Sequence, residues 1–156
     1  LQQAIRLETD GQRFYLEAAE KTSDVRGKDM FRSLAKDEVT HLKLVKDQYQ
    51  ALKKTGEWAA SPALKVKPVD LDKPIFPKGK QAAEKAVKSD YTERDALLFA
   101  MNIESDSYNL YRKSAQETAS ARGKEVYTFL AGEEQTHFDI VMMRYELVAG
   151  PQAWTS

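Results

Sequence analysis

With 156 residues, the chain is long enough for one domain with a hydrophobic core and too short for two ordinary domains. Its 24 basic and 24 acidic side chains cancel, so no net field favours nucleic acid or an anionic membrane as a partner. The absence of cysteine excludes disulfides, thiolate zinc sites and iron–sulfur clusters, so any metal must bind oxygen and nitrogen ligands. With no apolar run of membrane-spanning length and no signal-peptide pattern at the start, we expect a cytoplasmic protein.

Two amphipathic helices are predicted at about residues 1–22 and 26–54, because core-type residues recur along both with heptad spacing. The two stripes are Leu1, Ala4, Glu8, Gly11, Tyr15, Ala18 and Thr22, and then Gly27, Phe31, Leu34, Glu38, His41, Val45, Gln48 and Leu52. Ser23 and Asp24 between them are typical turn and helix-capping residues. The segment therefore predicts a helical hairpin over about residues 1–55.

A linker over about residues 56–92 follows, and its length suits a connection that crosses a bundle from one end to the other. We expect a short helix within it near residues 79–87. Thr92, with an acid three residues later at Asp95, predicts the start of the next long helix. Gly150 predicts the end of the last one.

The chain is an internal duplication, because it matches itself without gaps at an offset of 96 residues, with 15 identities in 42 aligned positions. Glu38-Val39-Thr40-His41 recurs as Glu134-Gln135-Thr136-His137. Helical composition alone could repeat leucine or alanine, but it gives no reason to repeat Glu-x-Thr-His. The second hairpin therefore spans about residues 93–149. We predict that residues 1–156 form a single all-α domain, an antiparallel four-helix bundle of two duplicated hairpins joined by a long crossover.

The repeated acids and histidines are expected to converge in the middle of this bundle. Glu8 and Glu38 lie 16 residues before and 14 residues after Asp24, so they face each other across an antiparallel hairpin. The same arithmetic applies in the second hairpin, and each histidine lies one helical turn beyond a glutamate on the same face. The converging side chains are Glu8, Glu38, His41, Glu104, Glu134 and His137.

Four carboxylates buried together repel one another and must be neutralised. Two divalent cations balance four carboxylates in charge and also use neutral imidazole as a ligand. One Glu from each of two helices, with Glu-x-x-His from the other two, is the ligand set of di-iron and di-manganese bundles. Both histidines of the chain occupy this position. The sequence therefore predicts a two-metal centre, and the alternative is a polar stripe that is solvated or buried at an oligomer interface.

The sequence resembles the ferritin-like superfamily, and most of all its rubrerythrin-related branch. The phrases that carry the likeness are Leu7-Glu8, Phe14-Tyr15, Ala18-Ala19 and Leu34-Ala35-Lys36-Asp37-Glu38-Val39-Thr40-His41-Leu42. They recur in weaker form in the second half, so the resemblance covers nearly the whole chain except the linker.

The resemblance implies a di-iron centre in which Glu38 and Glu134 bridge both metals. Glu8 and His41 would complete one metal, and Glu104 and His137 would complete the other. Manganese or zinc would be substitutes for iron, and no catalytic residue is expected apart from the metal centre.

Two departures from rubrerythrins limit the resemblance. A rubredoxin module needs cysteine, which this chain lacks, so electrons are expected from an external donor such as a rubredoxin-like protein, or from iron being oxidised. Rubrerythrins also carry an additional glutamate three residues after the third-helix ligand, where this sequence has Ser107. The likeness therefore does not extend to the peroxide-linked ligand exchange of that glutamate.

Four further residues are singled out near the predicted centre. Tyr15 and Tyr111 follow the first glutamate of each half by seven residues, so their hydroxyls either support the bridging carboxylates or simply find a partner in the core. Asp37 and Glu133, just before the bridging glutamates, are expected to face solvent or a neighbouring helix.

The leading expectation for function is an oxidoreductase that reduces hydrogen peroxide or dioxygen at the metal pair. The alternatives are a ferroxidase that handles iron and a non-enzymatic helical interaction bundle. Oxidation of an organic substrate would need an apolar pocket, which the sequence does not locate. We expect a homodimer, with or without exchange of hairpins between chains, and neither nucleic acid nor membrane as a partner.

Overall fold

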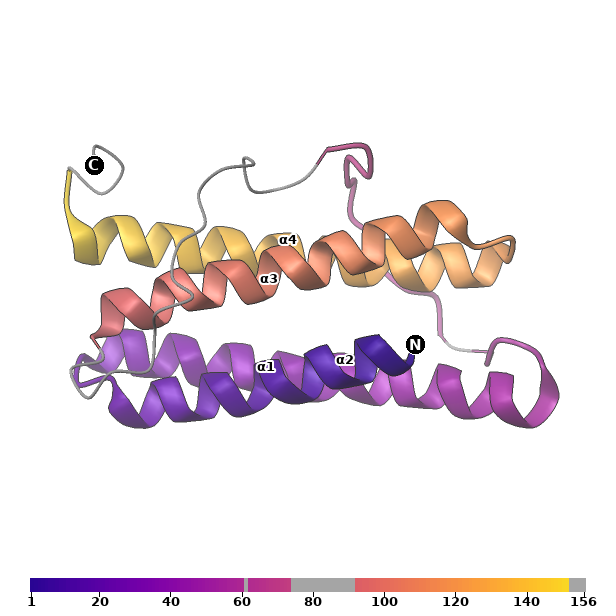
Figure 1. The fold of residues 1–156 in the computed structure, drawn as a ribbon, viewed down its shortest axis with the longest axis horizontal. Helices are drawn as coiled ribbons and strands as arrows, with labels where there is room; N and C mark the ends of the chain where they lie inside the picture. The colour runs from indigo at the N-terminus through magenta and orange to yellow at the C-terminus, as the bar shows by residue number, and fades with distance from the viewer. Residues whose placement is uncertain (61, 74–91, 152–156) are drawn as a thin grey trace.

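The computed structural model describes residues 1–60, 62–73 and 92–151, and within these residues it contains four α-helices and no strand. In chain order they are α1 (Gln2–Lys21), α2 (Val25–Thr55), α3 (Glu93–Glu117) and α4 (Ala121–Ala149). Helix α1 packs antiparallel to α2 and α3 packs antiparallel to α4, and the two hairpins lie against each other (Figure 1). The prediction of an all-α four-helix bundle is confirmed.

Local capping interactions fix the ends of the helices where the sequence predicts them. Asp24 and Ser120, which are equivalent in the repeat, each accept a hydrogen bond from the backbone N–H three residues later, at 3.0 Å. Thr92 and Asp95 form the predicted capping box at the start of α3. At the end of α2, Gly56 adopts a left-handed conformation with φ of 75°.

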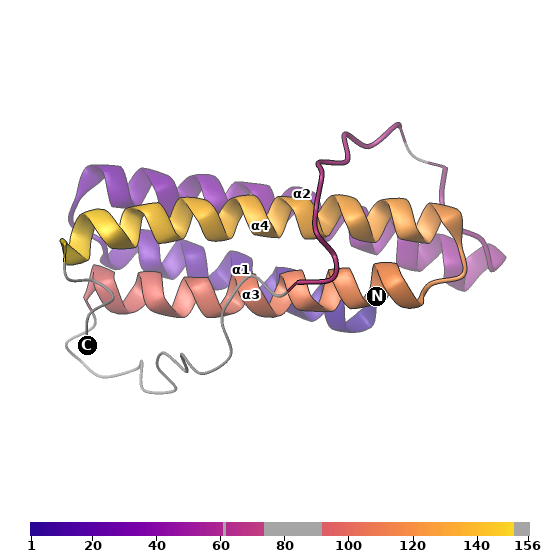
Figure 2. The same ribbon diagram turned by 90° about the horizontal axis from the view of Figure 1, so that it is seen from above.

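Helices α2 and α3 run in the same direction, so the end of α2 and the start of α3 lie at opposite ends of the bundle (Figure 1). The described part of the linker passes over α4 and then reaches α3, as the second view also shows (Figure 2). Lys67 donates a hydrogen bond to Thr136 of α4 at 2.9 Å, and Tyr108 of α3 donates one to the carbonyl oxygen of Asp70 at 2.8 Å. The short helix expected near residues 79–87 lies outside the described residues.

Two apolar clusters occupy the interior, one toward each end of the bundle. One contains Tyr15, Phe31, Leu34, Leu97, Met101, Phe138, Val141 and Tyr145 among others. The other contains Ala4, Val45, Tyr108, Tyr111, Val126, Leu130 and Ala131. On α1, Glu8 lies between Ala4 of the second cluster and Tyr15 of the first. A buried polar layer therefore separates the two clusters at mid-bundle.

Gly123, in the first turn of α4, is covered by the indole ring of Trp58 at the start of the linker. A Cβ at this position would lie 2.6 Å from Cζ2 of Trp58 and 2.9 Å from Oγ1 of Thr118. Alanine normally stabilises a helix by about 1 kcal/mol relative to glycine, whereas overpacking costs about 1–3 kcal/mol. The contact with Trp58 therefore decides whether alanine in place of Gly123 stabilises or destabilises the protein.

We predict that Gly123→Ala lowers the free energy of unfolding by about 1 kcal/mol, and that it does so through Trp58. In a Trp58→Ala background the same change should be neutral or less destabilising, because the two nearest atoms, both of the indole ring, are then absent. Urea unfolding of the two single variants and the double variant measures this coupling. Equal destabilisation in both backgrounds would contradict it.

Candidate metal centre

All six side chains predicted to bind metal lie together in the polar layer. Helices α1 and α3 each contribute one glutamate, and α2 and α4 each contribute a glutamate and a histidine. The six are Glu8, Glu38, His41, Glu104, Glu134 and His137. None is more than 3% exposed. The fold therefore brings the predicted ligands to one level and removes all of them from solvent.

The imidazole of His41 turns one nitrogen toward three carboxylates. Its Nδ1 lies 3.5 Å from Glu8, 3.6 Å from Glu38 and 3.3 Å from Glu134. These carboxylates come from three different helices, so the packing of both hairpins is needed to assemble the environment of this one histidine.

The other histidine repeats this arrangement. Nδ1 of His137 lies 3.2 Å from Glu38, 3.6 Å from Glu104 and 3.5 Å from Glu134. Glu38 and Glu134 thus approach both histidines, whereas the glutamates of α1 and α3 approach one each. The ligating atoms of Glu38, Glu134 and the two histidines all lie within 4.8 Å of one another.

The outer nitrogens of the histidines face a second pair of acids. Nε2 of His41 lies 3.9 Å from Glu133, and Nε2 of His137 lies 3.5 Å from Asp37. Such a carboxylate favours the proton on Nε2 and leaves Nδ1 free to bind a metal. These acids were expected to face solvent or a neighbouring helix, and the contact with histidine was missed. The available signal was the acid before the glutamate of Glu-x-x-His in both halves.

The two tyrosines bind different carboxylates from those predicted. The hydroxyl of Tyr15 donates to Glu104, and that of Tyr111 donates to Glu8. The reason is the antiparallel packing of α1 against α3, which brings each tyrosine level with the first glutamate of the other hairpin. The hydroxyls therefore support glutamates of the predicted centre, but these are Glu104 and Glu8 and not the pair Glu38 and Glu134 that was expected, and each tyrosine joins one hairpin to the other.

Several buried polar atoms of this layer have no hydrogen-bond partner among the described residues. They are Oε2 of Glu8, Oε2 of Glu104, both carboxylate oxygens of Glu134 and Nδ1 of His41. Leaving such an atom unsatisfied costs about 1–3 kcal/mol. Carboxylate oxygens with imidazole nitrogens form a donor set that suits iron, manganese or zinc. The residues therefore fit a two-metal centre, although the assignment of the ligands stays a prediction.

The comparison with known families agrees with this site. The rubrerythrin family model matches residues 1–145. The chain belongs to the rubrerythrin family. This confirms the resemblance read from the sequence and identifies a member of a ferritin-like di-iron family. No curated protein and no solved structure matches the chain. Within the described part of this rubrerythrin-family chain, no helix is both long and apolar enough to cross a membrane.

Burial raises the pKa of both Glu8 and Glu104 well above the usual glutamate value, and the charge of Glu134 acts in the same direction. In the metal-free protein the surroundings of these two side chains therefore favour their protonated, neutral form. Each then carries a proton that a bound cation must displace.

The remaining four groups form ion pairs in the absence of metal. Burial opposes the charge of Glu38 and Glu134, yet the pKa of both carboxyl groups is lowered. A hydrogen bond with Glu8 and contacts with both histidines outweigh burial at Glu38, and contacts with both histidines outweigh it at Glu134. Burial likewise opposes the imidazolium form of His41 and His137, but the surrounding carboxylates raise both pKa values well above the usual histidine value. These shifts favour two carboxylates beside two imidazolium ions in the metal-free layer, an arrangement whose charges balance.

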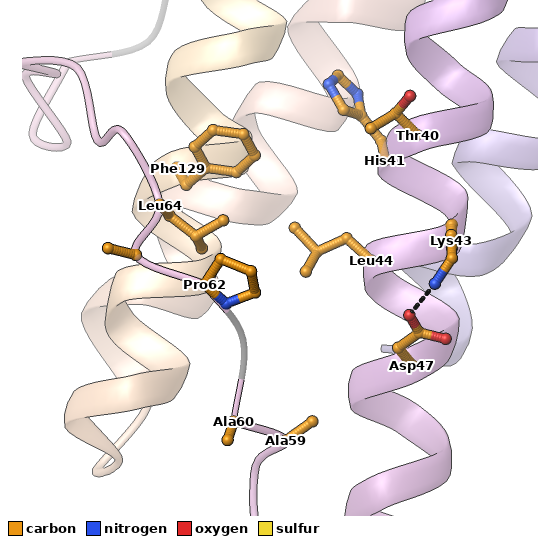
Figure 3. Close-up of a pocket in the computed structure, with 11 residues that line it drawn as sticks. Thr40, His41, Lys43, Leu44, Asp47, Ala59, Ala60, Pro62, Leu64 and Phe129 are labelled. Atoms are coloured by element: carbon orange, nitrogen blue, oxygen red, sulfur yellow. Dashed lines mark hydrogen bonds and ion pairs between the residues drawn. The ribbon is translucent and has the colours of Figure 1, made fainter.

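A pocket of about 460 Å³ borders one side of the centre (Figure 3). Leu44 of α2 faces Pro62 and Leu64 of the linker and Phe129 of α4 across it (Figure 3). His41 is among the residues that line it. The amino-acid sequence does not reveal this apolar pocket, because one wall is irregular linker that carries no periodic signal.

We predict that the metal-free protein is most stable at mildly acidic pH. The raised histidine pKa values contribute stability that is complete below about 6.5 and is lost as pH rises. Ionisation of Glu8 and Glu104 at higher pH acts in the same direction, because their pKa values are also raised. The lowered pKa values of Glu38 and Glu134 contribute stability that is lost as pH falls below about 4.5.

Metal binding should reverse this dependence of stability on pH, since a bound cation displaces the protons that the raised pKa values favour on the glutamic acids and the histidines. The gap in melting temperature between manganese-loaded and chelator-treated protein should widen by about 5 °C or more between about pH 5.5 and pH 8. Melting curves followed by circular dichroism test this. A metal-free melting temperature that rises steadily over that interval would contradict the charge assignment.

Proposed function

We propose that this rubrerythrin-family protein is a di-iron oxidoreductase that reduces hydrogen peroxide or dioxygen with electrons from an external donor. The observation that carries the proposal is the two-fold symmetric set of four buried carboxylates and two histidines, whose Nδ1 atoms point inward. A rubredoxin-like protein is the proposed kind of donor, because the given chain contains no cysteine with which to hold an iron–sulfur centre.

The positions of the carboxylates support a division of roles among them. Glu38 and Glu134 approach both histidines and are the proposed bridging ligands. Glu8 lies beside His41 in one half, and the equivalent pair lies in the other half. Two bound ferrous ions would supply the two electrons that, with two protons, convert one hydrogen peroxide molecule into two water molecules.

The residues around these ligands keep them in place. The hydroxyls of Tyr15 and Tyr111 each fix one oxygen of a glutamate, so the other oxygen is oriented toward the centre. Asp37 and Glu133 hold the outer nitrogens of the histidines. The apolar clusters above and below exclude bulk water, which strengthens every electrostatic interaction inside the layer.

A second candidate function is the oxidation of a small apolar organic molecule, and the pocket beside His41 is the observation that favours it. Iron-loaded, reduced protein incubated with dioxygen and toluene distinguishes the two functions. A hydroxylated product would favour the second candidate, and it should disappear when Leu44→Trp fills the pocket. Rapid oxidation by peroxide without any such product would favour the first.

We predict that reconstitution with ferrous iron saturates at two ions per chain and that peroxide re-oxidises the pair faster than air does. Glu104→Gln removes one ligand charge without changing shape, so it should weaken binding of the pair by more than about tenfold. Exposed Glu20→Gln is the matched control and should bind as the wild type does. Saturation at one ion or none would contradict the proposal, and accumulation of many ferric ions per chain would favour iron storage.

We also propose a homodimer. Ile140, Met143 and Leu147 follow one face of α4 and are 39%, 64% and 75% exposed, respectively. An exposed apolar stripe of this kind marks an interaction surface, and two-fold dimers are the commonest assembly. Light scattering should give twice the mass of the chain, and Met143→Lys should shift the protein toward monomer. A wild-type mass equal to one chain at every concentration would contradict the dimer.

A further inference from the structure

The linker breaks the two-fold symmetry of the centre on one side. Nζ of Lys67 lies 2.8 Å from Oε1 of Glu133 and donates a hydrogen bond to the hydroxyl of Thr136 at 2.9 Å. The other oxygen of Glu133, Oε2, faces Nε2 of His41 at 3.9 Å. A cation on the linker is thus connected to one of the two histidines through a single carboxylate.

Within the residues that the structure describes, the equivalent position in the other half has no such cation. Asp37 is the counterpart of Glu133 in the repeat and lies 3.5 Å from Nε2 of His137. Among the described residues, that histidine is its only ion-pair partner. Its side chain is 50% exposed, whereas that of Glu133 is 25% exposed. The two outer carboxylates therefore differ in both charge compensation and solvent access.

The sequence itself differs between the halves at the residue over which the linker passes. A Cβ on Gly132 would lie 3.2 Å from Cγ2 of Val69 and 3.4 Å from Cβ of Lys67, so glycine allows the linker to pass close to α4. The equivalent residue of the first half is Lys36, which is exposed. Both halves retain the Glu-x-Thr-His motif, but only the second half has a glycine at this position. The linker can therefore pack closely against the second half only.

We propose that Lys67 makes the two halves of the centre inequivalent, so that the first divalent ion binds beside His137 and the second binds beside His41. This inference rests on the proposed two-metal function. Lys67 compensates the charge of Glu133, whereas Asp37 keeps a negative charge that attracts a divalent cation to its own half. Because solvent screens these partly exposed charges, the two affinities should differ by about three- to tenfold through this effect.

The two histidines of the chain allow each half to be observed separately. Protein labelled with ¹⁵N-histidine gives one set of imidazole signals from each half, and these can be assigned with His41→Gln and His137→Gln. Chelator-treated wild-type protein is then titrated with zinc sulfate. The signals of His137 should shift during the first equivalent, and those of His41 mainly during the second.

Substitutions on the linker identify the cause of this order. Lys67→Met removes the cation and should make both histidines respond together, whereas Lys67→Arg should keep the wild-type order. Lys65→Met, at an exposed lysine two residues earlier, is the matched control and should also keep it. Simultaneous shifts in the wild type, or an unchanged order in Lys67→Met, would overturn the inference and leave the two-metal centre intact. If neither histidine responds to zinc, the proposed function fails together with the inference.

Discussion

The structure depends on the charge balance of a polar layer buried between two apolar clusters. Four carboxyl groups and two imidazoles cannot all take their usual ionised forms there, because repulsion among the carboxylates and the loss of hydration oppose it. Without metal, protons on Glu8 and Glu104 and on both histidines would make the layer neutral, and the raised pKa values of all four groups favour this distribution. With two divalent ions, the four carboxylates balance the metal charge and the imidazoles are neutral. Protons and metal ions are therefore alternative ways to satisfy the same site.

Assembly of the site is inseparable from the packing of one hairpin against the other. Each hairpin contributes only half of the glutamates and one histidine, and every Nδ1 atom contacts carboxylates from both hairpins. Tyr15 and Tyr111 extend this dependence, since each binds a glutamate on the other hairpin. A single hairpin would expose a row of acids on its apolar face. The second hairpin of the repeat covers these acids and supplies the other half of the site.

The sequence predicted the helices, their inward faces and the six clustered side chains, because periodicity and capping are local signals and the repeat marks equivalent positions. It could not predict the partners of Tyr15 and Tyr111, which depend on how α1 meets α3. It also missed Lys67 and the pocket, since the linker has no period from which to predict its path. One usable signal was present in the repeat itself. Gly132 stands where the first half has Lys36, a mismatch on a helix surface that indicates something passing close by.

Asymmetry of the centre follows from topology as well as from chemistry. One linker joins the two equivalent hairpins. A single linker cannot contact both hairpins in the same way, because it lies on one side of the two-fold axis that relates them. It lies over α4, so the cation that it carries reaches Glu133 and not Asp37. Exchange of hairpins between two chains would preserve the six ligands, since each site would still combine one first hairpin with one second hairpin. What exchange would change is which chain supplies Lys67. The inequivalence of the two half-sites would therefore persist in a swapped dimer only if the linker kept its place beside Gly132.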